Sequence, residues 1–199
     1  MVKKQPCGCF FDIDKLAQKR YNVSMKQELK NGLSADMHLV GRSQEENHFF
    51  VLALADKKQV GYCCFDIVGD ECKIVRIAVT NKDFLSKGVG NAMFKTMENF
   101  AYNNGAKYVS GIFVARGYRD ISEKTSKFYV SQGFVPEDDE SFCEREELFK
   151  TIKSAHPQFD APVTYDQNLY DKISKYNFEE NDIFSSQKSN TKCEPEIDL

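Results

Sequence analysis

The 199-residue sequence lacks several features that would place it in a specialised class of protein. It has only 5 Pro and 11 Gly, which excludes collagen-like chains and Pro/Gly-rich disordered chains. No apolar run approaches the roughly 18 residues of a membrane span, and the N-terminal residues 1–6 lead into no apolar signal segment. A His-Glu-x-x-His motif and a Gly-Lys-Ser/Thr phosphate loop are both missing. We therefore expect a cytoplasmic protein that makes no membrane contact.

The cysteines do not form a recognisable metal or disulfide framework. There are seven, an odd number, which together with the missing signal favours a reducing compartment. Cys7-Gly8-Cys9 supplies half of a zinc clip, but a closed zinc site needs four ligands, usually as two spaced pairs. Cys63 and Cys64 are adjacent in a predicted strand, so their side chains should point to opposite faces. We expect buried or incidental thiols and no metal site.

What the sequence does contain is enough apolar material for one core. Hydrophobic residues make up 41%, with 16 Phe and 9 Tyr, and the length suits one domain with a short appendage. The net charge of −3 disfavours nucleic-acid binding. The charge is unevenly spread, because residues 57–135 hold 12 Lys/Arg and 7 Asp/Glu whereas 137–147 and 179–199 are acidic. A solvated face accounts for the basic excess, and attraction of an anionic ligand accounts for it equally.

The first half of the chain reads as a helical segment followed by three strands. Residues 1–35 are basic and show helical spacing of apolar side chains: Leu16, Ala17, Tyr21, Met25, Leu29 and Leu33. Residues 49–56, 59–68 and 72–80 are strand-length runs separated by short turns. The simplest arrangement of these three strands is an antiparallel meander.

After Thr80 the pattern changes to strand, helix and strand. A polar loop leads to Gly88-Val89-Gly90 and a helical pattern that ends at Asn104-Gly105. A strand over 107–114 follows, and then a charged loop and a helix that ends at Gly133. A helix of this length between two strands is a crossover, so we expect the strands that end at Thr80 and Val114 to be parallel.

Gly88 and Gly90 lie where a strand meets a helix, a position suited to binding phosphate. Helix N-termini leave backbone N–H groups without partners and carry partial positive charge, and glycine lets the backbone approach a phosphate closely. Lys87 adds a cation. The dinucleotide fingerprint fails, because its third glycine would fall at Met93. A tight turn without any ligand is an equal alternative on this feature alone.

Three segments in order resemble the GNAT superfamily of acetyl-CoA-dependent N-acetyltransferases. They are Ile77-Ala78-Val79-Thr80, the loop Leu85-Ser86-Lys87-Gly88-Val89-Gly90, and Lys127-Phe128-Tyr129 through Gly133-Phe134. The resemblance covers about residues 49–135. It implies an α/β (α+β sandwich) fold, with a mixed, mostly antiparallel central sheet that contains a parallel, splayed pair of strands and is flanked by helices.

The resemblance also implies a role for each segment. Backbone groups of Ile77, Ala78 and Val79 would pair with the pantetheine arm of acetyl-CoA, and the Val79 N–H would polarise the thioester carbonyl. The loop Leu85, Ser86, Lys87, Gly88, Val89 and Gly90 would hold the pyrophosphate. Tyr129 would protonate the departing CoA thiolate, since a phenol is a suitable donor to a thiolate. The alternative is that Tyr129 has no catalytic role and only packs in the core beside Phe128 and Phe134.

Several positions depart from the family pattern. Leu85 replaces a Gln or Arg, Ser86 stands where Gly is frequent, and Ser122 replaces an Asn that contacts CoA, so it binds CoA through its hydroxyl or only caps a helix. The loop 115–120 is unusually basic and reaches the cofactor, the acceptor or only solvent. No general base stands out: the nearest acids are Asp66, Asp70 and Glu71. His38, His48 and His156 show no catalytic spacing.

These observations predict an acetyl-CoA-dependent N-acetyltransferase that acts on a primary amine by direct attack in a ternary complex. Residues 1–48 would be its N-terminal helical segment, 49–135 the acetyl-CoA-binding core, 136–178 a completing segment and 179–199 a flexible acidic tail. A homodimer is compatible with this reading. The alternative is a non-catalytic acyl-CoA-binding or protein-interaction module on the same fold. A toxin that acetylates aminoacyl-tRNA is less favoured, because the ends of the chain are acidic.

Overall fold

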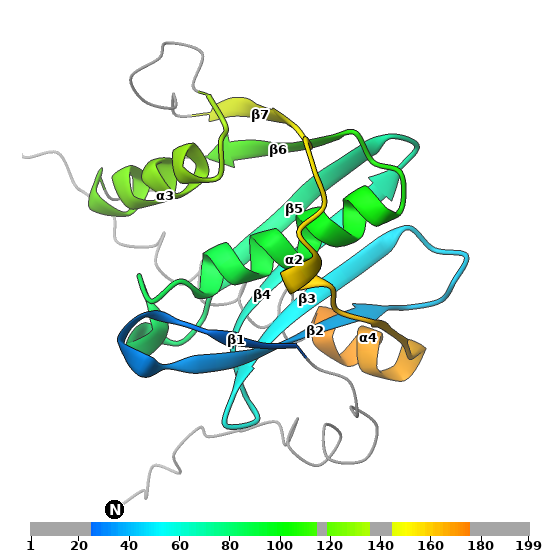
Figure 1. The fold of residues 1–199 in the computed structure, drawn as a ribbon, viewed down its shortest axis with the longest axis horizontal. Helices are drawn as coiled ribbons and strands as arrows, with labels where there is room; N and C mark the ends of the chain where they lie inside the picture. Colours follow the sequence, from blue (N-terminus) through cyan, green and yellow to red (C-terminus); the bar gives the residue numbers. More distant parts are fainter. Residues whose placement is uncertain (1–24, 115–118, 136–144, 176–199) are drawn as a thin grey trace, which may run out of the picture.

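The fold is an eight-stranded mixed sheet with helices on both faces, seen in a computed structural model that describes residues 25–114, 119–135 and 145–175. Seven strands follow the order β1 to β7 across the sheet (Figure 1), and β8 pairs with β2. The strands are β1 (Met25–Glu28), β2 (Ser34–Gly41), β3 (His48–Ala55), β4 (Lys58–Val68), β5 (Glu71–Val79), β6 (Tyr108–Val114), β7 (Arg145–Thr151) and β8 (Val163–Tyr165). The helices are α2 (Val89–Asn103), α3 (Arg119–Ser131) and α4 (Gln167–Ser174), with 3₁₀ turns η1 (Lys30–Gly32), η2 (Lys82–Phe84) and η3 (Pro157–Phe159).

Strands β3, β4 and β5 form the antiparallel meander that the sequence predicts. The β3–β4 turn contains Asp56 and Lys57, both with positive φ, which suits a tight two-residue hairpin. Each ladder contains one irregularity: the β3–β4 register shifts at Ala53/Leu54, and the β4–β5 register shifts at Cys64/Phe65. The second shift leaves Val75 as the extra residue on β5.

Strands β5 and β6 are parallel, as expected for a crossover through α2. Their ladder contains only three pairs, from Glu71–Tyr108 to Lys73–Ser110. Beyond Lys73 strand β5 continues to Val79 without pairing to β6, whose own outer neighbour is the antiparallel strand β7. Figure 1 shows β6 and β7 diverging from β5. The expected splayed pair is therefore confirmed, and the short parallel pairing of β2 with β8 adds a second parallel contact that was not expected.

Two apolar clusters lie on opposite faces of the sheet. The larger contains α2, whose Val89, Met93, Met97 and Ala101 recur at four-residue spacing and are all fully buried. The smaller is covered by the short helix α4 through Leu169, Tyr170 and Ile173. The predicted opposition of Cys63 and Cys64 is confirmed, because Cys63 belongs to the first cluster and Cys64 to the second.

The N-terminal helix expected over residues 1–35 is wrong for residues 25–35. Strand β1 pairs antiparallel with β2, and η1 makes the turn between them. The burial of β1 alternates along the chain, so Met25 and Gln27 face inward. Met25 lies in β1, and Leu29 and Leu33 flank the η1 turn, so a hairpin can also place apolar residues four apart. This is why the helical spacing was misleading here. Residues 1–24, the loop 115–118, the acidic 136–144 and the tail 176–199 lie outside the described residues.

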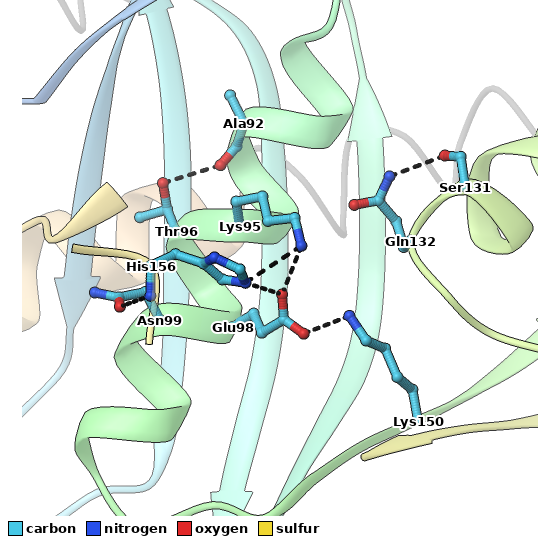
Figure 2. Close-up of polar contacts among 9 residues, drawn as sticks. All are labelled: Ala92, Lys95, Thr96, Glu98, Asn99, Ser131, Gln132, Lys150 and His156. Carbon is cyan, nitrogen blue, oxygen red and sulfur yellow. Dashed lines mark hydrogen bonds and ion pairs between the residues drawn. The ribbon is translucent and has the colours of Figure 1, made fainter. Parts of the chain in front are cut away.

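A buried charge cluster ties the C-terminal part of the sheet to α2 (Figure 2). The Glu98 side chain is 2% exposed; its Oε1 accepts from Lys150 of β7, and its Oε2 lies 3.0 Å from Lys95 Nζ and 3.2 Å from His156 Nε2. The His156 backbone N–H donates to Asn99 Oδ1 at 2.7 Å. One acidic residue in the middle of α2 thereby fixes β7 and the chain that leads to η3.

Candidate functional site

The free edge of β5 presents backbone groups to the space between the diverging strands. Thr80 N–H donates to the Val60 carbonyl at 2.9 Å, which makes Thr80 and, by alternation, Ala78 the residues that bond to β4. The N–H and C=O groups of Ile77 and Val79 therefore point away from β4, on the side where β6 has left the ladder. A second extended chain could pair with β5 along this edge.

The chain leaves β5 directly into the loop that starts α2. Ser86 has φ of 60° and Gly88 has φ of 101° in the left-handed region, so two positions of the loop use backbone conformations that favour glycine. The first helical acceptor is the Gly88 carbonyl, which receives the Ala92 N–H. The amides of Val89 and Gly90 consequently lie at the open, electropositive end of the helix.

The two glycines of the loop serve different purposes. Gly88 supplies the left-handed conformation at the N-cap. Gly90 allows α2 to approach α3, because a Cβ atom there would lie 3.2 Å from Phe128 Cε2. Val89 between them is fully buried and anchors the helix start in the core. The loop is therefore held by packing on one side while its amides remain at the end of the helix.

The outer residues of the loop are accessible. Leu85 is 52% exposed, Ser86 is exposed, and Lys87 is half-buried. The Lys87 carbonyl accepts the Lys30 N–H at 2.9 Å, so the hairpin of β1 and η1 supports the loop from the other side. Sequence reasoning missed this support because residues 25–35 were expected to be helical.

Tyr129 lies inside the core near this loop. Its side chain is 7% exposed, and its ring packs edge-on against Phe134 with centroids 5.6 Å apart. Burial, with a smaller contribution from Cys63 of β4, raises the pKa of the Tyr129 phenol well above its usual value. The phenol therefore stays protonated at neutral pH. The preceding residue, Phe128, is the one that meets Gly90.

The remaining predicted positions are only partly covered. Ser122 belongs to α3, but its side chain and the loop 115–118 lie outside what the structure describes. The acids near the strand ends have partners: Lys107 Nζ lies 3.3 Å from Asp70 Oδ2, and Ser110 donates to Glu71. Asp66 contacts His48 Nδ1, and His48 Nε2 lies 2.9 Å from Cys64 Sγ. The strand register thus brings His48 beside a carboxylate and a thiol, contacts that its spacing in the sequence did not indicate.

No group of three or more His, Cys, Asp and Glu side chains within residues 25–114, 119–135 and 145–175 has the arrangement of a metal site. No helix within these ranges is both long and apolar enough to span a membrane.

Comparison with known proteins gives a family-model match and several similar structures. Residues 45–136 match the acetyltransferase (GNAT) domain model. No curated protein sequence matches the chain. The GNAT domain of S. lividans PAT is 11% identical with a TM-score of 0.51, covering 64% of this chain and 96% of that one. A cAMP-binding acyltransferase from Mycobacterium smegmatis is 12% identical with a TM-score of 0.51, covering 81% of this chain and 58% of that one.

A further similar structure is the PaiA N-acetyltransferase of Thermoplasma acidophilum in complex with coenzyme A. It is 17% identical with a TM-score of 0.44, and the alignment covers 53% of this chain and 61% of that one. The two structures with a TM-score of 0.51 are 11% and 12% identical, so their similarity speaks for the fold alone. The family-model match, the strand order and the splayed β5–β6 pair agree with one another. The chain therefore has the GNAT fold, and residues 45–136 within it match the GNAT acetyltransferase domain model.

Proposed function

We propose that the protein is an acetyl-CoA-dependent N-acetyltransferase that transfers an acetyl group to a primary amine by direct attack in a ternary complex. The observation that supports this most is the continuity of two binding features. The open edge of β5 at Ile77 and Val79 is followed, after the η2 turn, by the amides at the open end of α2. An extended acyl-pantetheine arm with a pyrophosphate at one end needs these two features side by side.

The described residues fit such a co-substrate. Backbone groups of Ile77 and Val79 would pair with the two amides of the arm as a neighbouring strand does, with Ala78 holding β5 to β4. The amides from Ser86 to Gly90 would receive the pyrophosphate, and Lys87 would add a cation beside it. Leu85 would contribute only its backbone, because its apolar side chain cannot bond to phosphate.

The transfer itself needs a carbonyl-polarising donor and a proton source for the departing sulfur. The Val79 N–H serves as the donor to the thioester oxygen. The amine nitrogen attacks the carbonyl carbon, the carbon–sulfur bond breaks, and Tyr129 O–H gives its proton to the thiolate. The Tyr129 phenol carries its proton throughout the neutral range, because its usual pKa already lies above that range and burial raises the pKa further.

The first experiment measures thiol release from acetyl-CoA against a panel of primary amines and amine-bearing peptides. We expect Tyr129→Phe to lower kcat by about 100-fold or more while CoA binding persists. Tyr102→Phe is the matched control, because Tyr102 is 42% exposed on α2 and should leave kcat unchanged. Tight CoA binding with no turnover on any amine would favour the non-catalytic acyl-CoA-binding module. Failure of CoA to raise the melting temperature would reject both functions.

A second experiment tests the edge of β5 directly. Val79→Pro removes an N–H that points away from β4, so the sheet should survive while CoA turnover is lost. Ala78→Pro removes an N–H that bonds to β4 and should destabilise the sheet itself. Retained turnover in the Val79→Pro protein would show that this amide has no part in acetyl transfer.

A further inference from the structure

The face of the sheet under α4 contains a chain of three side chains that the proposed acetyl transfer does not use. Asp66 of β4 contacts Nδ1 of His48 of β3, and Nε2 of the same imidazole lies 2.9 Å from the sulfur of Cys64 of β4. In the neutral imidazole whose Nδ1–H donates to this carboxylate, Nε2 carries no proton and accepts the thiol hydrogen of Cys64. The three side chains thus lie in the order carboxylate, base and nucleophile.

The imidazole is held in this orientation from three sides. The ring of Phe50 meets it edge-on with centroids 5.7 Å apart, and the ring of Tyr170 from α4 does so at 5.8 Å. The carboxylate of Asp66 fixes the third side and sets the tautomer. A nucleophile within hydrogen-bond distance of a base that a third group orients is the arrangement of covalent acyl-transfer centres.

We propose that Cys64, His48 and Asp66 form a second nucleophilic centre, at which Cys64 accepts an acyl group from small activated esters or thioesters. The Cys64 proton moves to His48 Nε2 as the sulfur bonds to the carbonyl carbon. The bond from that carbon to the leaving oxygen or sulfur breaks, and the leaving group takes the proton from Nε2. The products are S-acyl-Cys64 and a free alcohol or thiol.

Burial of the thiol is compatible with this chemistry. Cys64 is fully buried, and burial raises the pKa of its thiol well above the usual range, so the resting group is a neutral S–H and not a thiolate. A neutral nucleophile is activated when the neighbouring base removes its proton during attack, as a serine hydroxyl is. The His48 and Asp66 side chains are 29% and 34% exposed, so the base borders solvent. Tyr170, which packs over His48 from the eight-residue helix α4, is the side chain that a donor must displace.

The experiment treats the full-length protein with 4-nitrophenyl acetate and maps acetylated cysteines by peptide mass spectrometry, with the rate of nitrophenol release alongside. Cys63 is a built-in control: it is the adjacent residue, equally buried, and its sulfur faces Met97 Sδ at 3.7 Å and no imidazole. Buried Cys72 is a second control. We expect acetyl on Cys64 and not on these two, faster labelling in Tyr170→Ala, and a loss of about 100-fold in His48→Gln.

Asp66 acts only through His48, so it is a positioning residue and needs a separate readout. Asp66→Asn should lower the rate of Cys64 labelling, and Asp66→Glu, which keeps a carboxylate, should restore part of that rate while the fold is unchanged in both variants. Several charged or titratable groups surround the three side chains: Tyr170 packs over His48, Arg76 of β5 lies opposite Cys64, and Arg42 and Glu46 lie beyond the Tyr170 ring. Unlabelled Cys64 in both wild type and Tyr170→Ala, equal labelling of Cys63, or an unchanged rate in His48→Gln would each overturn the proposal. The ester probe contains no CoA, so these outcomes are independent of acetyl-CoA turnover.

Discussion

Replacing Glu98 by Gln tests whether the charge cluster in the middle of α2 holds the two halves of the sheet together. The carboxylate is 2% exposed and meets Lys150, which is 14% exposed, and Lys95, which is 23% exposed. Removing one partner of a buried ion pair costs about 3–5 kcal/mol, because the remaining charges stay desolvated. Lys95 and His156 each border water, so we place the loss near the lower end, at about 3 kcal/mol. The melting temperature should fall by about 6–12 °C.

The assay is urea unfolding followed by circular dichroism, with Glu123→Gln as the matched control. Glu123 pairs with Lys127 one turn away on α3, and both side chains are well exposed, so its loss should cost at most about 0.5 kcal/mol. If Glu98→Gln costs less than about 1 kcal/mol, or no more than the control, the cluster does not contribute stability and the reasoning from burial fails.

The same carboxylate predicts a pH dependence. Burial by itself would raise the pKa of Glu98, but the hydrogen bonds and charges of Lys150 and Lys95 outweigh it and lower the pKa below the usual value. A lowered folded-state pKa stabilises the fold above the unfolded-state value of about 4.3, and this stabilisation is lost as the pH falls through the folded-state pKa. The difference in unfolding free energy between wild type and Glu98→Gln should therefore shrink below about pH 4. A difference that stays constant in acid would contradict the assignment.

Two further substitutions test the loop at the start of α2. Ser86→Gly should raise the unfolding free energy by about 0.5–1 kcal/mol. The left-handed φ of 60° costs a serine about 1–2 kcal/mol, whereas glycine adopts it freely but loses more chain entropy on folding, which offsets part of the gain. A loss of stability would show that the loop does not keep this conformation. Gly90→Val should cost about 1–3 kcal/mol by pushing Phe128 away, and Phe128→Leu in the same chain should restore part of it, measured as a double-mutant cycle of unfolding free energies. Additive costs would mean that the two residues do not share the contact.

Much of the sheet and the position of the loop could be predicted because their signals are local. The apolar runs of β3, β4 and β5 have strand length, and Gly88 marks the start of a helix whose buried residues recur every fourth position. The β1–β2 hairpin could not be predicted in this way. The spacing of Met25, Leu29 and Leu33 is compatible with a helix and also with a hairpin. Only the pairing of β1 with β2 distinguishes the two structures.

The cluster around His48 was missed for a different reason. If the β3–β4 ladder were regular from the Asp56–Lys57 turn onwards, His48 would pair with Phe65. The side chain of Asp66 would then lie on the opposite face of the sheet from that of His48. The shift at Ala53/Leu54 inserts one residue and brings His48 opposite Asp66, with Cys64 two residues away on the same face. A bulge of this kind has no reliable signal in the sequence, so the three side chains are brought together by a feature visible only in the structure.

The hydrogen bond from Lys30 N–H to the Lys87 carbonyl makes the first hairpin a natural reporter of events at the α2 loop. Lys30 lies far upstream in the sequence and outside the matched domain of 45–136, yet its amide proton is protected from solvent only while Lys87 keeps its place. Any anion that steadies the loop should slow deuterium uptake at Lys30, whereas uptake at Gly69, in the β4–β5 turn, should not change. Binding of an anion to the loop could then be followed by amide exchange at Lys30, without a fluorescent label and without a measurement of turnover.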